Sequence, residues 1–545
     1  MTTQTAAPST ASVDQQQSFR RFIPVCLAFA ALKLAIQIAG NILAQHAGYG
    51  IFRDEMYYLI CGRHLAFGYV DQPPMVALQA RLTDILFGFN HMWSLRLLSS
   101  LAGAFKVFLT GALVWAMGSA LPAGSRRAAA ALAMLGVTVA GVYLGLDSYL
   151  SMNSFEPVFW MPCALALIRI VQLSEIPGSE RAIRNWWIVL GVSAGLGLEN
   201  KWNEVFFLVA VLIALLVTPQ RRILASRWFA VAFGLIVAIA LPNLLWEAHY
   251  HWPTLEWLIG ISKSNKDVKL PPLQFLHAQF MTLTPWTVFL WGTGVIWLLV
   301  SKTARPFRFL GVLYPIFLGI MMVLHAKDYY LAPIYPIYFA AGAICWLPAQ
   351  RRSTPRAVRV AGYALLLVVG FVLTVPFSIP VLSPQKFVSW ARTMHYKAQD
   401  SETHGATILP QFYADRFGWH EMVEKVAAIY NSLPPQERAV TGIYTGNYGE
   451  ASAINLFGPR YGGLPVAISG HQTYWLWGPH GYTGQEMIII NGATLAEMKP
   501  YYASCTIAGV DDNPLAMPWE RNNIFLCHGR KGTYEADWKD FKHYY

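Results

Sequence analysis

Charged residues are scarce in this sequence. Asp, Glu, Lys and Arg make up 13% of the 545 residues, whereas soluble domains carry about 25%. This shortage excludes an ordinary soluble protein and favours a membrane protein. The net charge of +11 does not indicate a nucleic-acid partner, because the cations fall in short clusters between apolar runs rather than on one polar face. We therefore expect no nucleic-acid partner.

Cysteines and cofactor motifs are also few. The six cysteines show no metal-ligand spacing, which excludes a disulfide scaffold and a zinc module. The sequence has no glycine-rich Walker loop, no strand-linked dinucleotide fingerprint, no HExxH and no serine elbow, so the corresponding enzyme classes find no support. It has no internal repeat, and the Ser/Thr/Gln-rich first 18 residues are predicted to be disordered.

Long apolar segments dominate the first two-thirds of the chain. The first, RRFIPVCLAFAALKLAIQIAGNILAQ, is too long for the apolar part of a signal peptide and predicts a first spanning helix. With a span length of about 17–25 residues, roughly eleven segments qualify. They lie near 22–45, 93–120, 128–146, 154–172, 186–199, 203–218, 228–247, 275–300, 307–325, 331–349 and 357–379. Lys33 and Lys106 fall inside two of them, and the sequence gives no physical reason for either.

Basic clusters occupy alternate loops between these segments. The positive-inside rule then places the amino terminus in the cytoplasm and the polar tail after residue 384 outside it. The clusters are Arg20/Arg21, Arg126/Arg127, Arg181/Arg184, Arg221/Arg222, Lys302/Arg305/Arg308 and Arg351/Arg352/Arg356. The chemically rich loops all fall on the outer face, so we expect the protein to act there.

The tail differs in pattern from the rest. WHEMVEKVAAIYNSL and TLAEMKPYYA read as helices, whereas AVTGIYTG and EMIIING read as buried strands. We predict an all-α polytopic membrane domain at 1–383 and a soluble α/β domain at 384–545, the latter accessory to a site in the earlier loops. Cys505 and Cys527 lie in this domain, either as a disulfide or as free buried thiols.

The first outer loop, FRDEMYYLICGRHLAFGYVDQPPM, collects polar groups beside the first apolar helix. Asp54 and Glu55 open a predicted helix on which Asp54, Tyr57 and Tyr58 share one face. One interpretation is an N-cap Asp with a Glu that suits the helix dipole. The other is a general base flanked by sugar-stacking rings, with arginines such as Arg63 near enough to hold phosphate.

Asp71 stands before two prolines that favour a stiff turn. Its spacing leaves three roles open: a surface acid, a ligand of a divalent metal, or a partner of Arg53 or Arg63. No other cofactor is expected.

Two further outer loops carry lysines beside acids and tyrosines. LENKWNEV places Lys201 at the mouth of two short spans, and HAKDYYLAPIYP places Lys327 before Tyr329 and Tyr330. A snorkelling lysine and interfacial tyrosines explain such patterns without function. Lysines that bind a lipid phosphate explain them as well, because charges at this depth are costly. Glu156, near the top of a span, is a weaker substrate-binding candidate.

Taken in order, several motifs resemble bacterial glycosyltransferase family 39, which is related to protein O-mannosyltransferases and lipid A aminoarabinose transferases. The motifs are FRDEMYYLICGRHLAFGYVDQPPM, SYLSMNSFEPVFW, LGLENKW, LLWEAHYHWP and HAKDYYLAPIYP. The resemblance implies the GT-C fold, a bacterial inner-membrane location and a polyprenyl-phosphate-linked sugar donor. It also implies a catalytic Asp54, with Glu55 beside it, and donor-phosphate contacts from Lys201 and Lys327.

The sequence departs from that family at two places. Asp71-Gln72 stands where the aminoarabinose transferases have Glu-Lys, and Asn153 stands where many relatives have Asp, with Glu156 nearby. Both departures disfavour an aminoarabinose role and leave the acceptor open as a lipid, a glycan or a protein. We expect an inverting hexosyl- or pentosyltransferase; the alternatives are a polyprenyl-linked polysaccharide ligase or polymerase and a lipid-linked sugar transporter.

Overall fold

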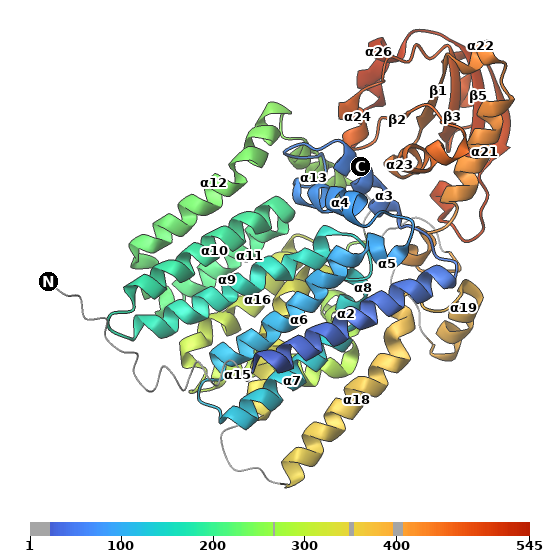
Figure 1. The fold of residues 1–545 in the computed structure, drawn as a ribbon. Coiled ribbons are helices and arrows are strands. Elements are labelled where there is room, and N and C mark those ends of the chain that lie inside the picture. The colour runs from blue at the N-terminus through green and yellow to red at the C-terminus, as the bar shows by residue number, and fades with distance from the viewer. Residues whose placement is uncertain (1–21, 265–267, 348–353, 396–406) are drawn as a thin grey trace.

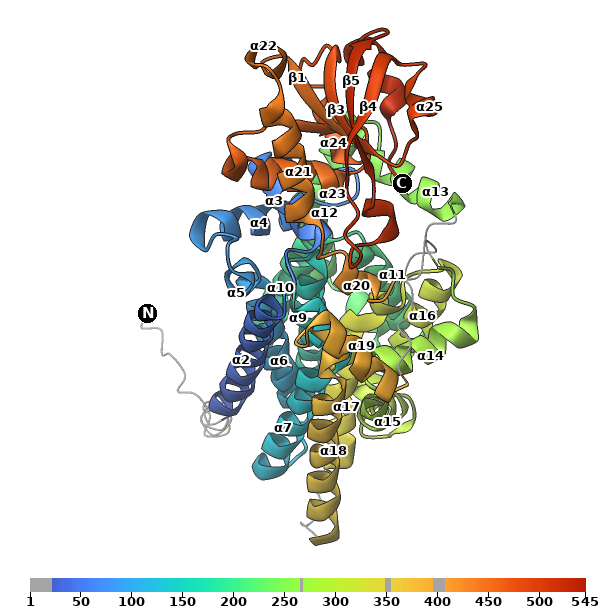
Figure 2. The same cartoon turned by 90° about the vertical axis from the view of Figure 1, so that its right-hand side faces the viewer.

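The computed structural model describes residues 22–264, 268–347, 354–395 and 407–545. The first 18 residues, with their predicted disorder, and the cations at 20–21 and 351–352 lie outside these ranges. Apolar helices form the larger part of the molecule, and a small domain with a sheet covers one end of them (Figures 1 and 2).

Each of the eleven predicted apolar segments contains a helix. These helices are α2 (Ile23–His46), α6 (Leu97–Met117), α7 (Ala123–Val139), α8 (Gly141–Leu146), α9 (Met152–Ser174), α10 (Glu180–Asn200), α11 (Asn203–Leu216), α12 (Arg227–His249), α14 (Pro272–Thr282), α15 (Val288–Val300), α16 (Arg308–Val323), α17 (Tyr335–Trp346) and α18 (Thr354–Ser378). The predicted all-α polytopic membrane domain is thereby confirmed.

Not every one of these helices spans a bilayer by itself. Within the described residues, six helices are long and apolar enough to do so, or up to eight if each of two sharply bent helix pairs counts as one span. The bent pairs are α11 with Pro219–Ala225, at 112°, and Pro272–Thr282 with Pro285–Val300, at 92°. The segment 331–349 forms only the 12-residue α17, because its first part is a 3-10 turn that contains Pro333. The count of eleven from the sequence is therefore approximate.

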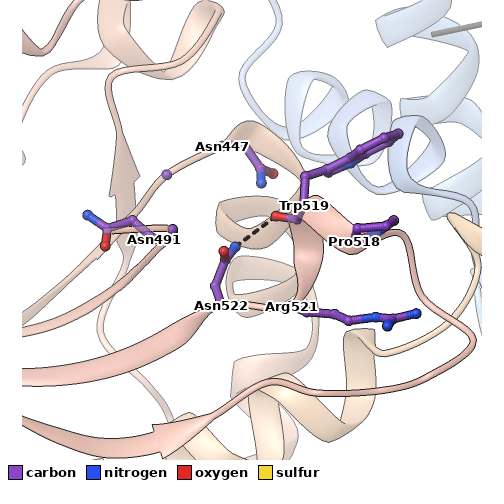
Figure 3. A pocket seen from close by; sticks show the side chains of 8 residues that line it. Asn447, Asn491, Pro518, Trp519, Arg521 and Asn522 are labelled. Atoms are coloured by element: carbon purple, nitrogen blue, oxygen red, sulfur yellow. Dashed lines mark hydrogen bonds between the residues drawn. The ribbon is translucent and has the colours of Figure 1, made fainter. Parts of the chain in front are cut away.

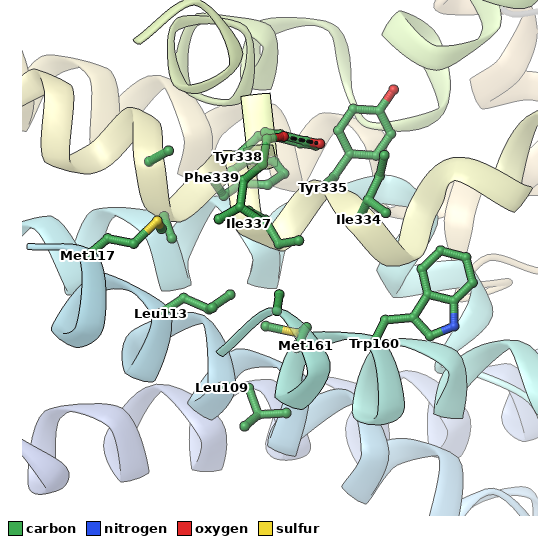
Figure 4. Packing of buried hydrophobic residues seen from close by; sticks show 14 of the residues in the cluster. Leu109, Leu113, Met117, Trp160, Met161, Ile334, Tyr335, Ile337, Tyr338 and Phe339 are labelled. Atoms are coloured by element: carbon green, nitrogen blue, oxygen red, sulfur yellow. Dashed lines mark hydrogen bonds between the residues drawn. The ribbon is translucent and has the colours of Figure 1, made fainter. Parts of the chain in front are cut away.

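The core of the membrane domain lies around α17, whose residues from Tyr335 to Ile344 are all buried. Figure 4 shows side chains of α6 and α9, such as Leu113 and Met161, packed beside those of α17. Gly294 of α15 and Gly342 of α17 permit close contact, because a Cβ at either would collide with the backbone of the other helix. Small residues at such crossings are typical of membrane helix packing.

Short helices lie at the end of the bundle that faces the small domain (Figure 2). They are α3 (Arg53–Arg63), α4 (Met75–Leu86), α5 (Met92–Leu95), α13 (Pro253–Lys263) and α19 (Pro384–Thr393). The predicted helix after Asp54 is confirmed as α3.

The tail contains a five-stranded sheet in the order β2-β1-β3-β5-β4. The strands β1 (Thr441–Thr445), β2 (Ala467–Ser469) and β3 (Glu486–Asn491) are parallel, and β4 (Tyr502–Val510) and β5 (Asn523–Arg530) join antiparallel. The tail helices are α20 (Gln411–Ala414), α21 (Trp419–Ser432), α22 (Pro435–Arg438), α23 (Tyr448–Phe457), α24 (Thr473–Trp477), α25 (Leu495–Met498) and α26 (Tyr534–Asp537). The predicted α/β tail is confirmed, with Cys505 and Cys527 joined by a disulfide across β4 and β5.

One expectation for the tail is wrong in part. TLAEMKPYYA is helical only in α25, Leu495–Met498, and its end already belongs to β4. Pro500 cannot continue a helix, because it lacks an N–H group and its ring clashes with the preceding turn.

The tail packs directly on the first outer loop. One continuous apolar cluster contains Met56 and Ile60 of α3, Val423 of α21, Ile454 of α23 and Ile488 of β3. A core shared by both parts fixes α3 between the membrane helices and the sheet. This packing positions the polar residues described next.

Candidate functional site

Helix α3 places two neighbouring acids in different surroundings. Glu55 is fully buried; its carboxylate accepts bonds of 2.8 Å from Arg96 Nε and Nη2, 2.7 Å from Leu150 N and 2.9 Å from Phe52 N. Burial raises the pKa of Glu55, but Arg96 outweighs it, and the net pKa is lowered. This carboxylate is therefore an ionised structural link, which does not favour the predicted catalytic role for Glu55.

Asp54 is less enclosed and keeps 30% of its side chain exposed. Tyr448 of the tail donates a 2.7 Å hydrogen bond to Asp54 Oδ1, and Arg53 Nε lies 3.7 Å from the same oxygen. The N-cap of α3 is Phe52, so the N-cap interpretation of Asp54 is wrong. Asp54 is a partly exposed carboxylate in the first helical turn, free to meet a substrate.

Aromatic rings surround this carboxylate. The Tyr57 and Tyr448 rings lie 4.8 Å apart, and Asp54 helps to raise the pKa of the buried Tyr58, after the larger effect of burial. The Tyr57 hydroxyl lies 2.6 Å from Thr473 Oγ1 and 3.0 Å from Asp71 Oδ1. The predicted face of Asp54, Tyr57 and Tyr58 thus exists, but Tyr57 is buried and serves to hold the tail and Asp71 in place.

Asp71 gains no support as a metal ligand. No group of three or more His, Cys, Asp or Glu side chains suited to an ion occurs among the described residues. The hydroxyl of Tyr57 is a partner of Asp71 that the sequence did not suggest.

A second polar cluster forms around Lys201, which follows the carboxyl end of α10. Lys201 Nζ donates to Asn153 Oδ1 at 2.7 Å and to Glu156 Oε2 at 3.2 Å, and it lies 4.0 Å from the centre of the Tyr330 ring. The Tyr329 ring follows at 5.6 Å. The structure thus brings together four of the residues predicted from separate loops: Lys201, Glu156, Tyr329 and Tyr330.

Tyr149 links the two clusters. Its hydroxyl accepts a 3.4 Å bond from Asn153 Nδ2, the amide whose oxygen binds Lys201. Burial raises the pKa of Tyr149 to about 12, hydrogen bonding from Asn153 opposes this rise, and the nearby charges of Asp54 and Arg416 act in opposite directions. Lys201 thus reaches the Tyr149 hydroxyl through Asn153, and the Arg416 guanidinium lies 4.5 Å from the centre of the Phe412 ring, which is 5.0 Å from that of Tyr149.

Arg416 of the tail is a cation that the sequence analysis missed. It is 2% exposed, its Nε donates to Phe412 O at 3.2 Å, and within the described residues Nη1 and Nη2 find no hydrogen-bond partner. Burial, helped by Arg96 and opposed by Glu55, lowers the pKa of Arg416 to about 9, so it stays charged at neutral pH. A buried guanidinium whose two terminal nitrogens lack a hydrogen-bond acceptor among the described residues is costly.

The other predicted cations lie differently. Arg63 ends α3 and binds Asp84 of α4 through Nε at 3.0 Å. It lies about 13 Å along the helix from Asp54. Lys327 is half-buried and precedes the 3-10 turn Asp328–Ile334, which carries Tyr329 and Tyr330. Arg63 therefore lies outside the two clusters. Lys327 is close in the chain to Tyr329 and Tyr330, which belong to the Lys201 cluster.

Known proteins match this architecture. Residues 71–246 match the family model described as dolichyl-phosphate-mannose-protein mannosyltransferase. The chain is 28% identical over 240 residues to the lipid A galacturonosyltransferase RgtD of Rhizobium johnstonii. This alignment covers 43% of this chain and 46% of that relative. The match thus spans less than half of the relative's own length.

Solved structures extend the likeness to almost the whole chain. ArnT from Cupriavidus metallidurans bound to undecaprenyl phosphate superposes with a TM-score of 0.57 at 13% identity, covering 92% of this chain and 97% of that one. Its apo state gives 0.56 with the same identity and coverage. This chain has the GT-C fold. The resemblance to the GT-C glycosyltransferases that the motifs predicted is confirmed.

The GT-C fold explains why sequence reasoning missed part of the site. Arg416, Tyr448 and Thr473 reach α3 from positions about 360–420 residues further along the chain. Neither periodicity nor motif spacing records such a contact. The expectation that the tail is merely accessory therefore needs revision, since two of its side chains touch Asp54 and Tyr57 directly.

Proposed function

We propose that this protein is an integral-membrane glycosyltransferase. It moves a sugar from a polyprenyl-phosphate-linked donor to a lipid, glycan or protein acceptor at the outer face of a bacterial inner membrane. The observation that carries the proposal is the partly exposed Asp54 carboxylate of α3, together with Lys201, which is bonded through Asn153 to the Tyr149 hydroxyl, and Arg416, which approaches the same tyrosine through the Phe412 ring. The undecaprenyl phosphate in the ArnT structure supports the choice of donor, and the name of the RgtD relative supports transfer of a sugar.

The chemistry is a single displacement at the anomeric carbon. The acceptor oxygen forms a bond to that carbon while the bond from the carbon to the phosphate oxygen breaks, and the electron pair leaves with the phosphate. Asp54 takes the proton of the acceptor hydroxyl. A single displacement inverts the anomeric carbon, which is the stereochemistry we propose; the transferred sugar is a hexose or a pentose.

Charge that grows on the departing phosphate needs nearby cations. An ammonium has three N–H donors; Lys201 uses one for Asn153 and one for Glu156, which leaves one for a ligand. Arg416 offers Nη1 and Nη2. We assign these two residues to the phosphate, keep Lys327 as a further contact, and assign Glu156, Tyr329 and Tyr330 to the donor side of the site.

The test is transfer by the purified chain in detergent from an added polyprenyl-phosphate sugar to envelope extract of a strain without the gene. Asp54→Asn keeps the shape but cannot accept a proton, so we expect a loss of about 10²–10⁴-fold in rate with the fold intact. Asp84→Asn, which changes another outer-loop acid bonded to Arg63, should leave the rate unchanged. A folded Asp54→Asn enzyme at the normal rate would refute the assignment. Transfer in detergent also separates an enzyme from a transporter, since detergent leaves no barrier to cross.

Arg416→Gln tests the phosphate assignment. We expect a rise in donor KM of about tenfold or more, as for a lost bond to a charged group. Thermal stability should stay equal or increase, because a buried charge whose terminal nitrogens lack a hydrogen-bond acceptor has been removed. Arg63→Gln is the matched control and should leave donor KM unchanged, because Arg63 binds Asp84 and lies outside both clusters. A stability loss without a KM change in Arg416→Gln would mean a structural role instead.

A further inference from the structure

A pocket of about 450 Å³ opens in the tail, next to α3 (Figure 3). It lies where the parallel strands β1 and β3 end, and its walls come from the residues after those strands and from a turn before β5. The lining residues are Gly446, Asn447, Asn491, Gly492, Pro518, Trp519, Arg521 and Asn522. Ligand pockets in proteins usually measure about 300–1,000 Å³.

The topology of the sheet explains why a pocket forms here. From β1 the chain passes through α23 to β2 on one side, and the next strand, β3, returns to the other side of β1. The connections therefore diverge at the carboxyl ends of β1 and β3. Such a switch point leaves a crevice outside the strand ends, which is where open α/β sheets bind ligands.

The wall chemistry suits a sugar. Three amides line the pocket. Asn447 caps α23 and donates to Glu520, and Asn522 Nδ2 donates to Glu450 Oε1 and Trp519 O. Asn491 accepts a 3.2 Å bond from Ala493 N, so within the described residues Asn491 Nδ2 and Asn522 Oδ1 are left for a ligand. The Trp519 ring packs against the apolar cluster that contains Tyr413 and points away from Asn491 (Figure 3), and Gly492 leaves room without a side chain. Arg521 is exposed and holds Pro514 O and Ala516 O through Nη2 alone, so its other nitrogens can meet an anionic group.

The pocket is connected to Asp54. Asn447, which lines it, immediately precedes Tyr448, the residue that donates to Asp54. The Arg53 guanidinium lies 6.0 Å from the centre of the Trp519 ring, while Arg53 Nε lies 3.7 Å from Asp54. One arginine thus contacts both the pocket wall and the proposed base.

We propose that this pocket binds a sugar of the acceptor that carries an anionic substituent. The sugar hydroxyls meet Asn491 Nδ2 and Asn522 Oδ1, and the anionic group meets Arg521. Bound there, the acceptor extends past Arg53 and presents a hydroxyl to Asp54. The inference rests on the proposed transferase function and adds the acceptor class, a glycan or glycolipid with acidic sugars rather than a bare protein.

Two variants alter the pocket with little risk to the fold. Gly492 is exposed and has an ordinary backbone φ, and a Cβ there would lie 3.5 Å from Asn522 Oδ1, so Gly492→Leu fills the pocket without strain. Arg521→Ala removes the cation. Arg438→Ala is its matched control, because Arg438 Nη2 also holds two backbone carbonyls, of Asn431 and Leu433, at 3.1 and 3.0 Å, yet Arg438 does not line the pocket.

Binding is measured by saturation-transfer NMR on the full chain in detergent, with methyl glucuronide and methyl glucoside as probes. The glucuronide should bind about tenfold more tightly, as expected for a bond to a charged group. Arg521→Ala should abolish this preference, Gly492→Leu should abolish binding of both probes, and Arg438→Ala should match the wild type. Absence of probe binding to the folded wild type, or equal binding by wild type and Gly492→Leu, would overturn the proposal.

Kinetics separate this proposal from the one it rests on. In the transfer assay, Gly492→Leu and Arg521→Ala should raise the KM for acceptor extract and leave donor KM and the Asp54→Asn loss unchanged. Unchanged acceptor KM in both variants, while Asp54→Asn still abolishes transfer, would overturn the pocket alone. No transfer by the wild type would instead refute the transferase function, and the NMR result would stand by itself.

Discussion

Asp54 and Glu55 are adjacent in the chain, yet only Asp54 is partly exposed. Glu55 is held by Arg96 and two backbone N–H groups, whereas Asp54 is bonded by one tyrosine and partly exposed. A residue's chemical role thus depends on how many of its lone pairs the fold already uses. The sequence presents both acids equally and cannot make this distinction.

The different surroundings of Asp54 and Glu55 should show in the stability of variants at each position. Glu55→Gln leaves the buried Arg96 without its counter-charge, so we expect the free energy of unfolding to fall by about 3–5 kcal/mol. Asp54→Asn should change it by only a few tenths of a kcal/mol, as is usual for surface substitutions (roughly ±0.5 kcal/mol). Thermal unfolding of both variants in the same detergent decides the matter. Equal melting temperatures would mean that Glu55 does not hold α3 in place.

Tyr448 gives a second test at the residue scale. Its hydroxyl orients Asp54 through a 2.7 Å bond, so Tyr448→Phe should slow transfer by about 10- to 100-fold, the effect of losing a hydrogen bond to a charged group. Tyr482→Phe is the control, because Tyr482 donates a similar 2.8 Å bond to Val466 O inside the tail. In the Asp54→Asn background, Tyr448→Phe should add little further loss. A full additional loss there would show that Tyr448 acts separately from Asp54.

At the scale of elements, buried charge joins three helical segments of the membrane domain. Asp147, just after α8, lies 3.1 Å from Lys33 Nζ of α2 and 2.8 Å from Lys106 Nζ of α6, and all three side chains are buried. Lys33 also donates to Tyr143 O at 3.0 Å. The two lysines that were unexplained from the sequence therefore share one carboxylate.

Because the two lysines share one carboxylate, we expect Asp147→Asn and Lys33→Met to differ in stability. Asp147→Asn leaves two buried cations without a counter-charge and should lower the free energy of unfolding by about 3–5 kcal/mol. Lys33→Met leaves a neutral Lys106–Asp147 pair and an apolar side chain, so its melting temperature should stay close to that of the wild type. The measurement is thermal unfolding of the three proteins in one detergent. If Lys33→Met were as unstable as Asp147→Asn, the shared-carboxylate explanation would fail.

Elements differ in how far the sequence predicts them. Apolar length identified all eleven helical segments, and periodicity found α21, β1 and β3. It missed three strands: β2, with three residues; β4, an edge strand whose residues are mostly exposed and which lacks a continuous apolar run; and β5. Only part of the candidate site was predicted. The residues found belong to local sequence motifs: Lys201, Glu156, Tyr329 and Tyr330. Arg416 and Tyr448 were missed because they reach the site only when the tail packs on the membrane domain.

At the scale of the whole molecule, the tail should respond to pH through Asp511. Burial raises the pKa of Asp511 to about 7, with Lys425 opposing and Glu520 adding to the shift. The folded state therefore binds a proton more tightly than the unfolded state. The stability that this gives is fully present below pH ~4 and is lost as pH rises through about 7.

Asp511→Asn should remove this dependence. We expect the variant to be more stable than the wild type by about 1–3 kcal/mol at pH 8, with the difference vanishing near pH 4. Asp512→Asn is the control, since Asp512 is 76% exposed and should show little change. Thermal unfolding between pH 4 and pH 8 gives the comparison. A constant difference across that range would exclude titration of Asp511 as the cause.

The orientation of the whole molecule is a prediction that the fold makes sharper. The tail and α3 lie at one end of the bundle, and α2 begins at the other end (Figure 2). Because successive membrane helices run in alternate directions, the basic clusters at 126–127, 181–184, 221–222 and 302–308 fall at the end where α2 begins. By the positive-inside rule this end faces the cytoplasm, which puts the tail and the candidate site outside.

Reporter fusions and thiol counts test this orientation independently. Alkaline phosphatase fused after residue 384 should be active, and the same fusion after residue 121, between α6 and α7, should be inactive. The disulfide of Cys505 and Cys527 requires an oxidising compartment, so the denatured chain should take up four maleimides without reductant, at Cys26, Cys61, Cys163 and Cys345, and six after reduction. Six labels without reductant, together with an inactive fusion at 384, would place the tail in the cytoplasm and remove the candidate site from the outer face.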